Sequence, residues 1–154
     1  MADFYADSSA LVKRHIPEIG ATWFQALADP VAGNVITTAR ISMTEVYSAL
    51  NRRIREATLD VADYVLIVAD FDALCATQYT LVELTPLIVE RARLLLERHP
   101  LRAYDAVHLA SALTANDALA AASLPALTFL SADHRLLNAA HAEGLATDNP
   151  NAHP

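Results

Sequence analysis

Four acidic residues, Asp7, Glu45, Asp105 and Asp133, stand where an apolar element ends or inside a helix that should carry little charge. Carboxylate oxygens are the ligands that hard cations such as Mg²⁺ and Mn²⁺ prefer, and such ions assist the hydrolysis of phosphodiesters. Four like charges brought together without an ion would repel one another strongly. If these side chains meet in space, we expect a divalent cation among them, or a cationic side chain when no ion is bound.

Three of the four acids have a simple structural explanation when each is taken alone. Asp7 and Asp133 precede predicted helices, and aspartate is a common N-cap residue. Glu45 lies inside a predicted helix, at the boundary of its apolar face, where a glutamate is normally solvated. None of these three residues identifies a metal site by itself, and capping by Asp7 is compatible with a second role.

Asp105 is the most informative of the four acids. The segment 104–113 is apolar nearly all round, which is typical of a buried helix. An unpaired carboxylate in such a helix is costly, so it requires a cation, a hydrogen-bond network or a raised pKa. The alternative is N-capping near the start of the helix, with His108 or Arg102 as the partner of the carboxylate.

The elements that would position these acids alternate along the chain. Apolar or β-branched segments predict strands at 4–6, 34–38, 79–84, 127–130 and 145–147. Apolar spacing and capping residues predict helices at 8–14, 18–28, 41–57, 60–76, 85–99, 103–115 and 133–142. This alternation predicts an α/β fold, a three-layer α/β/α sandwich with a mostly parallel central sheet.

Parallel sheets bind ligands beyond the carboxyl ends of their strands, at the point where the strand order reverses. Asp7 follows the first predicted strand directly, and Ser131 and Asp133 follow the strand at 127–130. If these two strands are neighbours, both acids reach one crevice.

Length, charge and composition restrict the functional classes further. The 154 residues predict a single domain, 1–154. The net charge of −7 argues against sequence-independent nucleic-acid binding but not against a nuclease. No glycine-rich phosphate loop, basic leader or membrane-spanning apolar run is found, so we expect a soluble, cytoplasmic protein with no membrane partner. Candidate contacts to RNA phosphates are Arg14, Arg40, Arg52, Arg53 and Arg55. For each of them, a place on a solvated helix face is an equally good explanation.

Four segments resemble, in order, the motifs of PIN-domain proteins: FYADSSALVK at 4–13, ISMTEV at 41–46, YDAVHLA at 104–110 and FLSADHRL at 129–136. The resemblance covers nearly the whole chain. Within that family, the short single-domain form is similar to the VapC toxins of type II toxin–antitoxin pairs.

The resemblance implies a PIN-like α/β/α fold and an endoribonuclease that depends on Mg²⁺ or Mn²⁺. It also implies a cognate antitoxin that blocks the site. We expect a homodimer, and we expect the apolar excess on the helix with Trp23 and around 64–71 to serve either the homodimer or the antitoxin. By motif position, the metal-binding and catalytic acids are Asp7, Glu45, Asp105 and Asp133, and the supporting hydroxyls are Ser9 and Ser131. His134 and Arg135 occupy positions where some members carry a further acid, which leaves the ligands of a second ion open.

Other classes of function remain as alternatives. A non-catalytic PIN-like protein that only binds RNA or an antitoxin would form its complexes without cleaving RNA. A phosphatase of the haloacid dehalogenase type requires a second acid two residues after the first, where Ser9 stands. A receiver domain requires a lysine after a late strand, and none is found there.

Overall fold

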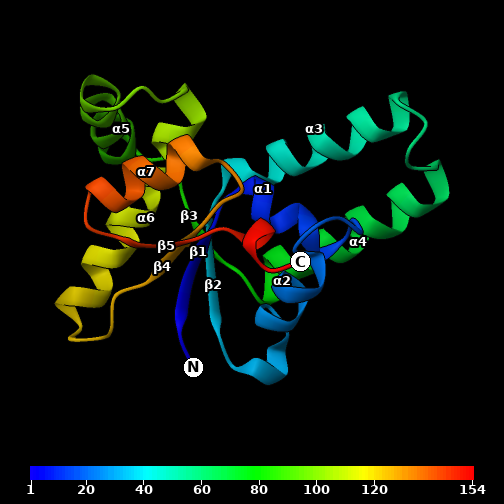
Figure 1. Ribbon diagram of the computed structural model, residues 1–154, viewed down its shortest axis with the longest axis horizontal. Helices are drawn as coiled ribbons and strands as arrows, with labels where there is room; N and C mark the ends of the chain where they lie inside the picture. The colour runs from blue at the N-terminus through cyan, green and yellow to red at the C-terminus, as the bar shows by residue number, and fades with distance from the viewer.

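The computed structural model describes all 154 residues, which form a five-stranded parallel sheet with helices on both faces (Figure 1). The strands are β1 (Asp3–Ala6), β2 (Val35–Ala39), β3 (Thr80–Val82), β4 (Thr128–Leu130) and β5 (Ala146–Asp148). The α-helices are α1 (Ser8–Leu11), α2 (Ala21–Leu27), α3 (Ile41–Arg55), α4 (Val61–Thr77), α5 (Pro86–Arg98), α6 (Ala103–Ala121) and α7 (His134–Ala142). Three short 3₁₀ helices are η1 (Val12–Arg14), η2 (Pro30–Ala32) and η3 (Pro150–Ala152).

The helices divide into two layers because side chains alternate across the sheet. Tyr5 and Phe129 point to one face and pack with α5, α6 and α7. Ala6, Ile36 and Leu130 point to the other face and pack with α1 to α4. Figure 1 shows the second layer extending well beyond the sheet as the α3–α4 hairpin. The predicted three-layer α/β/α architecture with a parallel sheet is therefore confirmed. No helix combines the length and apolarity needed to cross a membrane.

Two predicted helices have the wrong length. The helix predicted at 18–28 is α2, which begins only at Ala21. Gly20 has a φ of 80°, a left-handed conformation that cannot be part of the helix. Helix α6 does not end at 115 but continues through an alanine-rich segment to Ala121. Alanine is the strongest helix former, which explains the longer helix. Asn116 lies inside this helix and does not end it, and its Oδ1 accepts a hydrogen bond from the Leu127 N–H at 3.0 Å.

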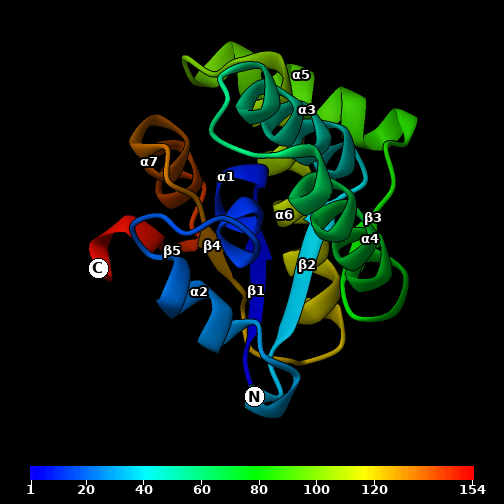
Figure 2. The same ribbon diagram turned by 90° about the vertical axis from the view of Figure 1, so that its right-hand side faces the viewer.

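The strand order is β3-β2-β1-β4-β5, so β1 is the central strand and the order reverses between β1 and β4. These two strands pair in parallel, with Ala6 opposite Leu130. Figure 2 shows β1 running from the N-terminus directly into α1, at the edge of the sheet where the strands end. The segments that follow β1 and β4 therefore leave the sheet side by side.

Candidate active site

Asp7 follows β1 and is the N-cap of α1, with a nearly buried carboxylate that accepts three hydrogen bonds. Its Oδ1 accepts from Ser9 Oγ at 2.6 Å and from the Ala10 N–H at 3.0 Å. Its Oδ2 accepts from Ser131 Oγ at 2.6 Å. Burial raises the pKa of Asp7, and the neighbouring His108 and these donors offset only part of that increase.

Ser131 joins the ends of β1 and β4. Its side chain is fully buried, donates to Asp7 and accepts the backbone N–H of Asp133 at 3.0 Å. Ser9 makes a similar connection, because its Oγ accepts the Ala132 N–H at 2.9 Å. The two hydroxyls thus connect the loop after β1 with the loop after β4.

Asp133 is the N-cap of α7, and its Oδ1 accepts from the backbone N–H groups of Arg135 and Leu136. The side chain is exposed to solvent. Capping is therefore an observed role of Asp133, as it is of Asp7, and it leaves Oδ2 without a hydrogen-bond partner.

Asp105 lies in the first turn of α6, whose N-cap position is held by Arg102, so Asp105 is not the cap. Its carboxylate makes no hydrogen bond or ion pair, and neither His108 nor Arg102 is its direct partner. Burial and then the charge of Asp133 raise its pKa, with smaller contributions from Asp7 and Glu45. The other three predicted acids, Asp7, Glu45 and Asp133, are therefore each within electrostatic reach of Asp105.

Glu45 lies in the second turn of α3, and its Oε1 is 2.5 Å from Nε2 of His108 on α6. The imidazole is buried, and its Nδ1 is 2.9 Å from the Tyr5 hydroxyl. Glu45 Oε2 makes no hydrogen bond. From the sequence, His108 is a possible partner of Asp105 or a buried histidine that supports a ligand. The spacing of residues within one helix does not show its contact with α3.

The oxygen donors suit a hard cation better than any other ligand, because Asp105, Glu45 Oε2 and Asp133 Oδ2 have no protein partner. Burial is the main cause of the raised pKa of Asp105, and the neighbouring acids add a repulsion that a divalent ion would relieve. In the arrangement seen here, however, no three His, Cys, Asp or Glu side chains lie close enough together to hold a metal ion. The donor chemistry fits Mg²⁺ or Mn²⁺, and the side chains would have to move toward one another to coordinate it.

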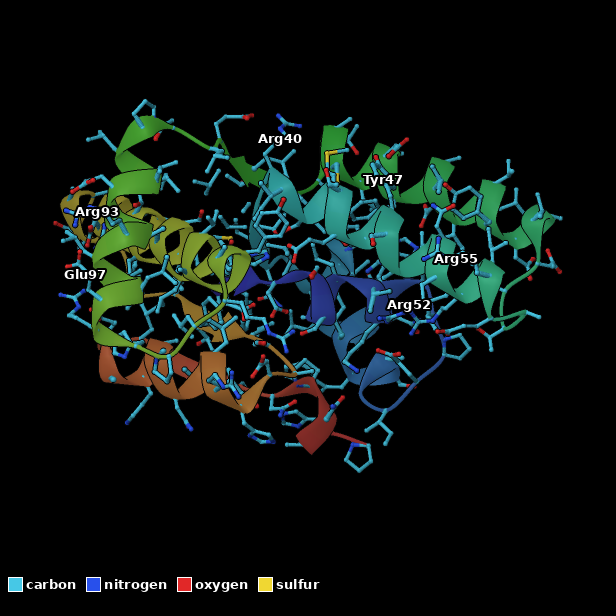
Figure 3. The ribbon with its side chains drawn as sticks, turned by 90° about the horizontal axis from the view of Figure 1, so that it is seen from above. Arg40, Tyr47, Arg52, Arg55, Arg93 and Glu97 are labelled. Carbon is cyan, nitrogen blue, oxygen red and sulfur yellow. The ribbon has the colours of Figure 1, made fainter.

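A cleft of about 500 Å³ is lined by Ser9 and Ala132, which lie close in sequence to Asp7 and Asp133, and by Arg52 and Arg53 of α3, but none of the four acids is part of its lining. Of the five candidate arginines, Arg52 and Arg55 make no ion pair and extend from α3 into solvent (Figure 3). Arg40 and Arg53 are neutralised by ion pairs with acidic side chains. The fifth, Arg14, donates to a backbone carbonyl. Arg52 and Arg55 are thus the two of the five whose side chains have no protein partner, and Arg14 also keeps an unpaired charge.

The sequence of this chain matches the PIN-domain family over residues 4–142. The chain therefore belongs to the PIN-domain family. Ribonuclease VapC45 of Mycobacterium tuberculosis is 34% identical to it over 140 residues, which is 91% of this chain and 90% of that protein. The chain is thus a homologue of the VapC ribonucleases.

Solved structures show the same fold at lower sequence identity. PAE2754 from Pyrobaculum aerophilum has a TM-score of 0.63 at 18% identity, over 98% of this chain and 85% of that one. A toxin–antitoxin complex from Klebsiella pneumoniae has a TM-score of 0.59 at 17% identity, over 96% of this chain and 97% of that one. At these identities the two structures support the fold alone.

Proposed function

We propose that this VapC-type PIN-domain protein is an endoribonuclease that hydrolyses RNA phosphodiester bonds with Mg²⁺ or Mn²⁺, and acts as the toxin of a type II toxin–antitoxin pair. The observation that supports the proposal is that the charges of Asp133, Asp7 and Glu45 all act on Asp105, in a chain homologous over 91% of its length to a VapC ribonuclease. The family of PIN-domain ribonucleases is generally metal-dependent.

In the proposed mechanism the residues that would hold the ion are Asp7, Glu45, Asp105 and Asp133. When bound, such an ion polarises the phosphate, acidifies an attacking water and stabilises the charge that develops in the transition state. Ser9 and Ser131 orient the Asp7 carboxylate through their 2.6 Å hydrogen bonds.

Cleavage of RNA by the purified chain tests this mechanism. We expect cleavage with Mg²⁺, none with EDTA, and a loss of at least about a hundredfold in Asp105→Asn. Asp117→Asn is the matched control, because Asp117 lies on the same helix but pairs with Arg91, away from the acids. Cleavage that persists both in EDTA and in Asp105→Asn would rule out the metal-dependent mechanism.

The same assay separates the second candidate function, a PIN-like protein that binds RNA or an antitoxin without cleaving. One observation favours it: no three potential ligands are within metal-binding distance in this arrangement. In that case RNA or antitoxin would still bind, but no metal ion would produce cleavage by the wild-type chain.

RNA would reach the acids along the cleft that Arg52 lines. A phosphate contact by Arg52 predicts that Arg52→Ala weakens RNA binding and lowers the slope of log K against log salt by about 0.7 for a single strand. Arg93→Ala is the control, since Arg93 lies on α5 and pairs with Glu90 and Glu97 (Figure 3). Equal effects of the two substitutions would indicate a general charge effect and argue against a phosphate contact.

The proposed partner is an antitoxin, and a structural neighbour of this chain is a toxin–antitoxin complex. We expect the small protein encoded next to this gene to copurify with the chain and to suppress RNA cleavage when present in equal amount. Copurification without suppression would show a partner that is not an inhibitor of this site.

A further inference from the structure

His108 is a buried polar side chain that the proposed mechanism does not use. It lies on α6 between β1 and α3, with only 1% of its surface exposed. One ring nitrogen, Nδ1, is 2.9 Å from the Tyr5 hydroxyl, and the other, Nε2, is 2.5 Å from Oε1 of Glu45. Three elements of the fold, β1, α6 and α3, are thus joined by a continuous chain of hydrogen bonds.

The direction of these hydrogen bonds follows from the chemistry of the groups. A carboxylate oxygen and an unprotonated ring nitrogen are both acceptors, so a contact of 2.5 Å between Glu45 and His108 requires a proton between them. Tyr5 is fully buried and stays a phenol, because burial raises its pKa well above the ordinary value. Its O–H can donate to Nδ1, which places the imidazole proton on Nε2, facing Glu45.

Tyr5 is itself held firmly. Its ring stacks on Phe129 of β4, with 5.3 Å between the ring centroids and 7° between the planes. Both aromatic rings are fully buried in the core on the α5–α7 face of the sheet. The orientation of the His108 ring is therefore fixed by the central strands rather than by α6 alone.

We infer that His108 is a positioning residue, which holds Glu45 Oε1 through its Nε2–H so that Oε2 is the oxygen presented to a cation. Tyr5 selects the orientation and the tautomer of the imidazole. This inference rests on the proposed function, in which Glu45 is a ligand of the cation. The hydrogen bonds themselves are present without any ion. Outer hydrogen bonds of this kind orient carboxylate and imidazole ligands in metal proteins, and their loss weakens metal binding about 10- to 100-fold.

The protonation of His108 can be measured in the metal-free protein. In long-range ¹H–¹⁵N spectra of ¹⁵N-labelled chain, we expect Nε2 of His108 to carry a proton. We expect Tyr5→Phe, which keeps the stacked ring but removes the hydroxyl, to shift the proton partly to Nδ1. An Nε2 without a proton in the wild type would place the proton on Glu45 and overturn the inference, and so would a spectrum unchanged by Tyr5→Phe.

Binding of Mn²⁺, followed by isothermal titration calorimetry, tests the consequence for the site. We expect His108→Leu to bind Mn²⁺ about 10- to 100-fold more weakly than the wild type, and His108→Gln, which keeps an N–H donor, to recover part of that loss. The matched control is His99→Gln, since His99 Nε2 makes a comparable 2.6 Å contact with Glu143, between α5 and the end of α7. It should bind Mn²⁺ as the wild type does.

The outcomes separate the inference from the function on which it rests. A wild-type chain that binds no Mn²⁺ refutes the proposed metal site, whatever the NMR spectra show. A wild type that binds Mn²⁺, together with a His108→Gln variant that unfolds at the wild-type temperature and binds it no better than His108→Leu, overturns the positioning role. Equal losses in His99→Gln would do the same, because they would reflect a general loosening of the helices.

Discussion

Replacing Ser131 with alanine removes one hydroxyl that serves two of the four acids. The buried Ser131 Oγ is the only hydrogen-bond donor to Oδ2 of Asp7, at 2.6 Å, and it accepts the Asp133 N–H at 3.0 Å. A hydrogen bond to a charged group contributes about 1.5–3 kcal/mol and a neutral one about 0.5–1.5 kcal/mol. Because water can replace the second contact at the exposed Asp133, we expect Ser131→Ala to lower the free energy of unfolding by the first contribution alone, about 1.5–3 kcal/mol at pH 7.

The loss should depend on pH in a defined direction. The Ser131 hydroxyl stabilises ionised Asp7, whose pKa burial has already raised, and its removal raises that pKa further. The difference between wild type and Ser131→Ala is therefore full above the pKa that Asp7 has in the folded variant, which is the higher of the two folded values. It shrinks as the pH falls through that value and the carboxyl becomes protonated.

Urea denaturation in EDTA, at several pH values between 7 and 4, measures both effects. Ser111→Ala is the matched control: this serine is similarly buried, but its Oγ donates to the Val107 carbonyl within the same helix and lies beside the Tyr5 hydroxyl, and it contacts none of the four acids. Such back-bonding contributes little, so its removal should cost less than about 1 kcal/mol. A loss for Ser131→Ala no larger than for Ser111→Ala, or a loss that does not change with pH, would refute the reasoning.

Three further predictions concern the charge cluster, the C-terminal segment and the α4 surface. Asp105→Asn should unfold at a higher urea concentration than the wild type at pH 7 in EDTA, because the pKa of Asp105 is raised in the folded state and the ionised carboxylate therefore destabilises the fold. This gain in stability should decrease as the pH falls below the folded-state pKa and disappear below the pKa of the unfolded chain. Gly20→Ala should cost about 1–3 kcal/mol by thermal unfolding, since its Cβ would lie 2.2 Å from the Pro150 carbonyl oxygen, whereas Gly33→Ala meets no atom within 4 Å and should cost less. If α4 forms the expected homodimer, Leu66→Glu, at a side chain that is 69% exposed, should shift light-scattering mass from dimer to monomer.

Much of the fold could be predicted because its signals are local. The alternation that places Tyr5 and Phe129 on one face and Ile36 on the other is visible in the sequence, and so are caps such as Asp60, which accepts the Asp63 N–H at 2.8 Å. The end of α6 was predicted wrongly. The polar pair Asn116 and Asp117 interrupts an alanine-rich segment and resembles a helix end, because the contact of Asn116 with the distant Leu127 N–H is not visible in the sequence.

The contacts of the candidate site were less predictable than its residues. The positions of the motifs select Glu45 and Asp105. The partner of His108, however, depends on how α3 and α6 lie against each other, and the spacing of residues within either helix does not show this. The neutralisation of Arg53 by Glu18 is likewise a tertiary contact, at 3.0 Å, between α3 and the loop before α2. Side chains that appear equivalent in sequence, such as Arg52 and Arg53, therefore differ in their freedom to bind a phosphate.

The topology explains why acids gather at this point despite their mutual repulsion. After β1 the chain continues into α1 on one face of the sheet, and after β4 it continues into α7 on the other face, so the two connections diverge at this junction. Asp7 can then be held by hydroxyls from two loops, while Glu45 and Asp105 approach from the helical layers on either side. Burial, together with repulsion from the neighbouring acids, raises the pKa of Asp105, so the ionised carboxylate lowers the stability of the metal-free fold. A divalent cation bound beside Asp105 would offset that cost, so the folded chain is expected to unfold at a higher temperature with Mn²⁺ than with EDTA.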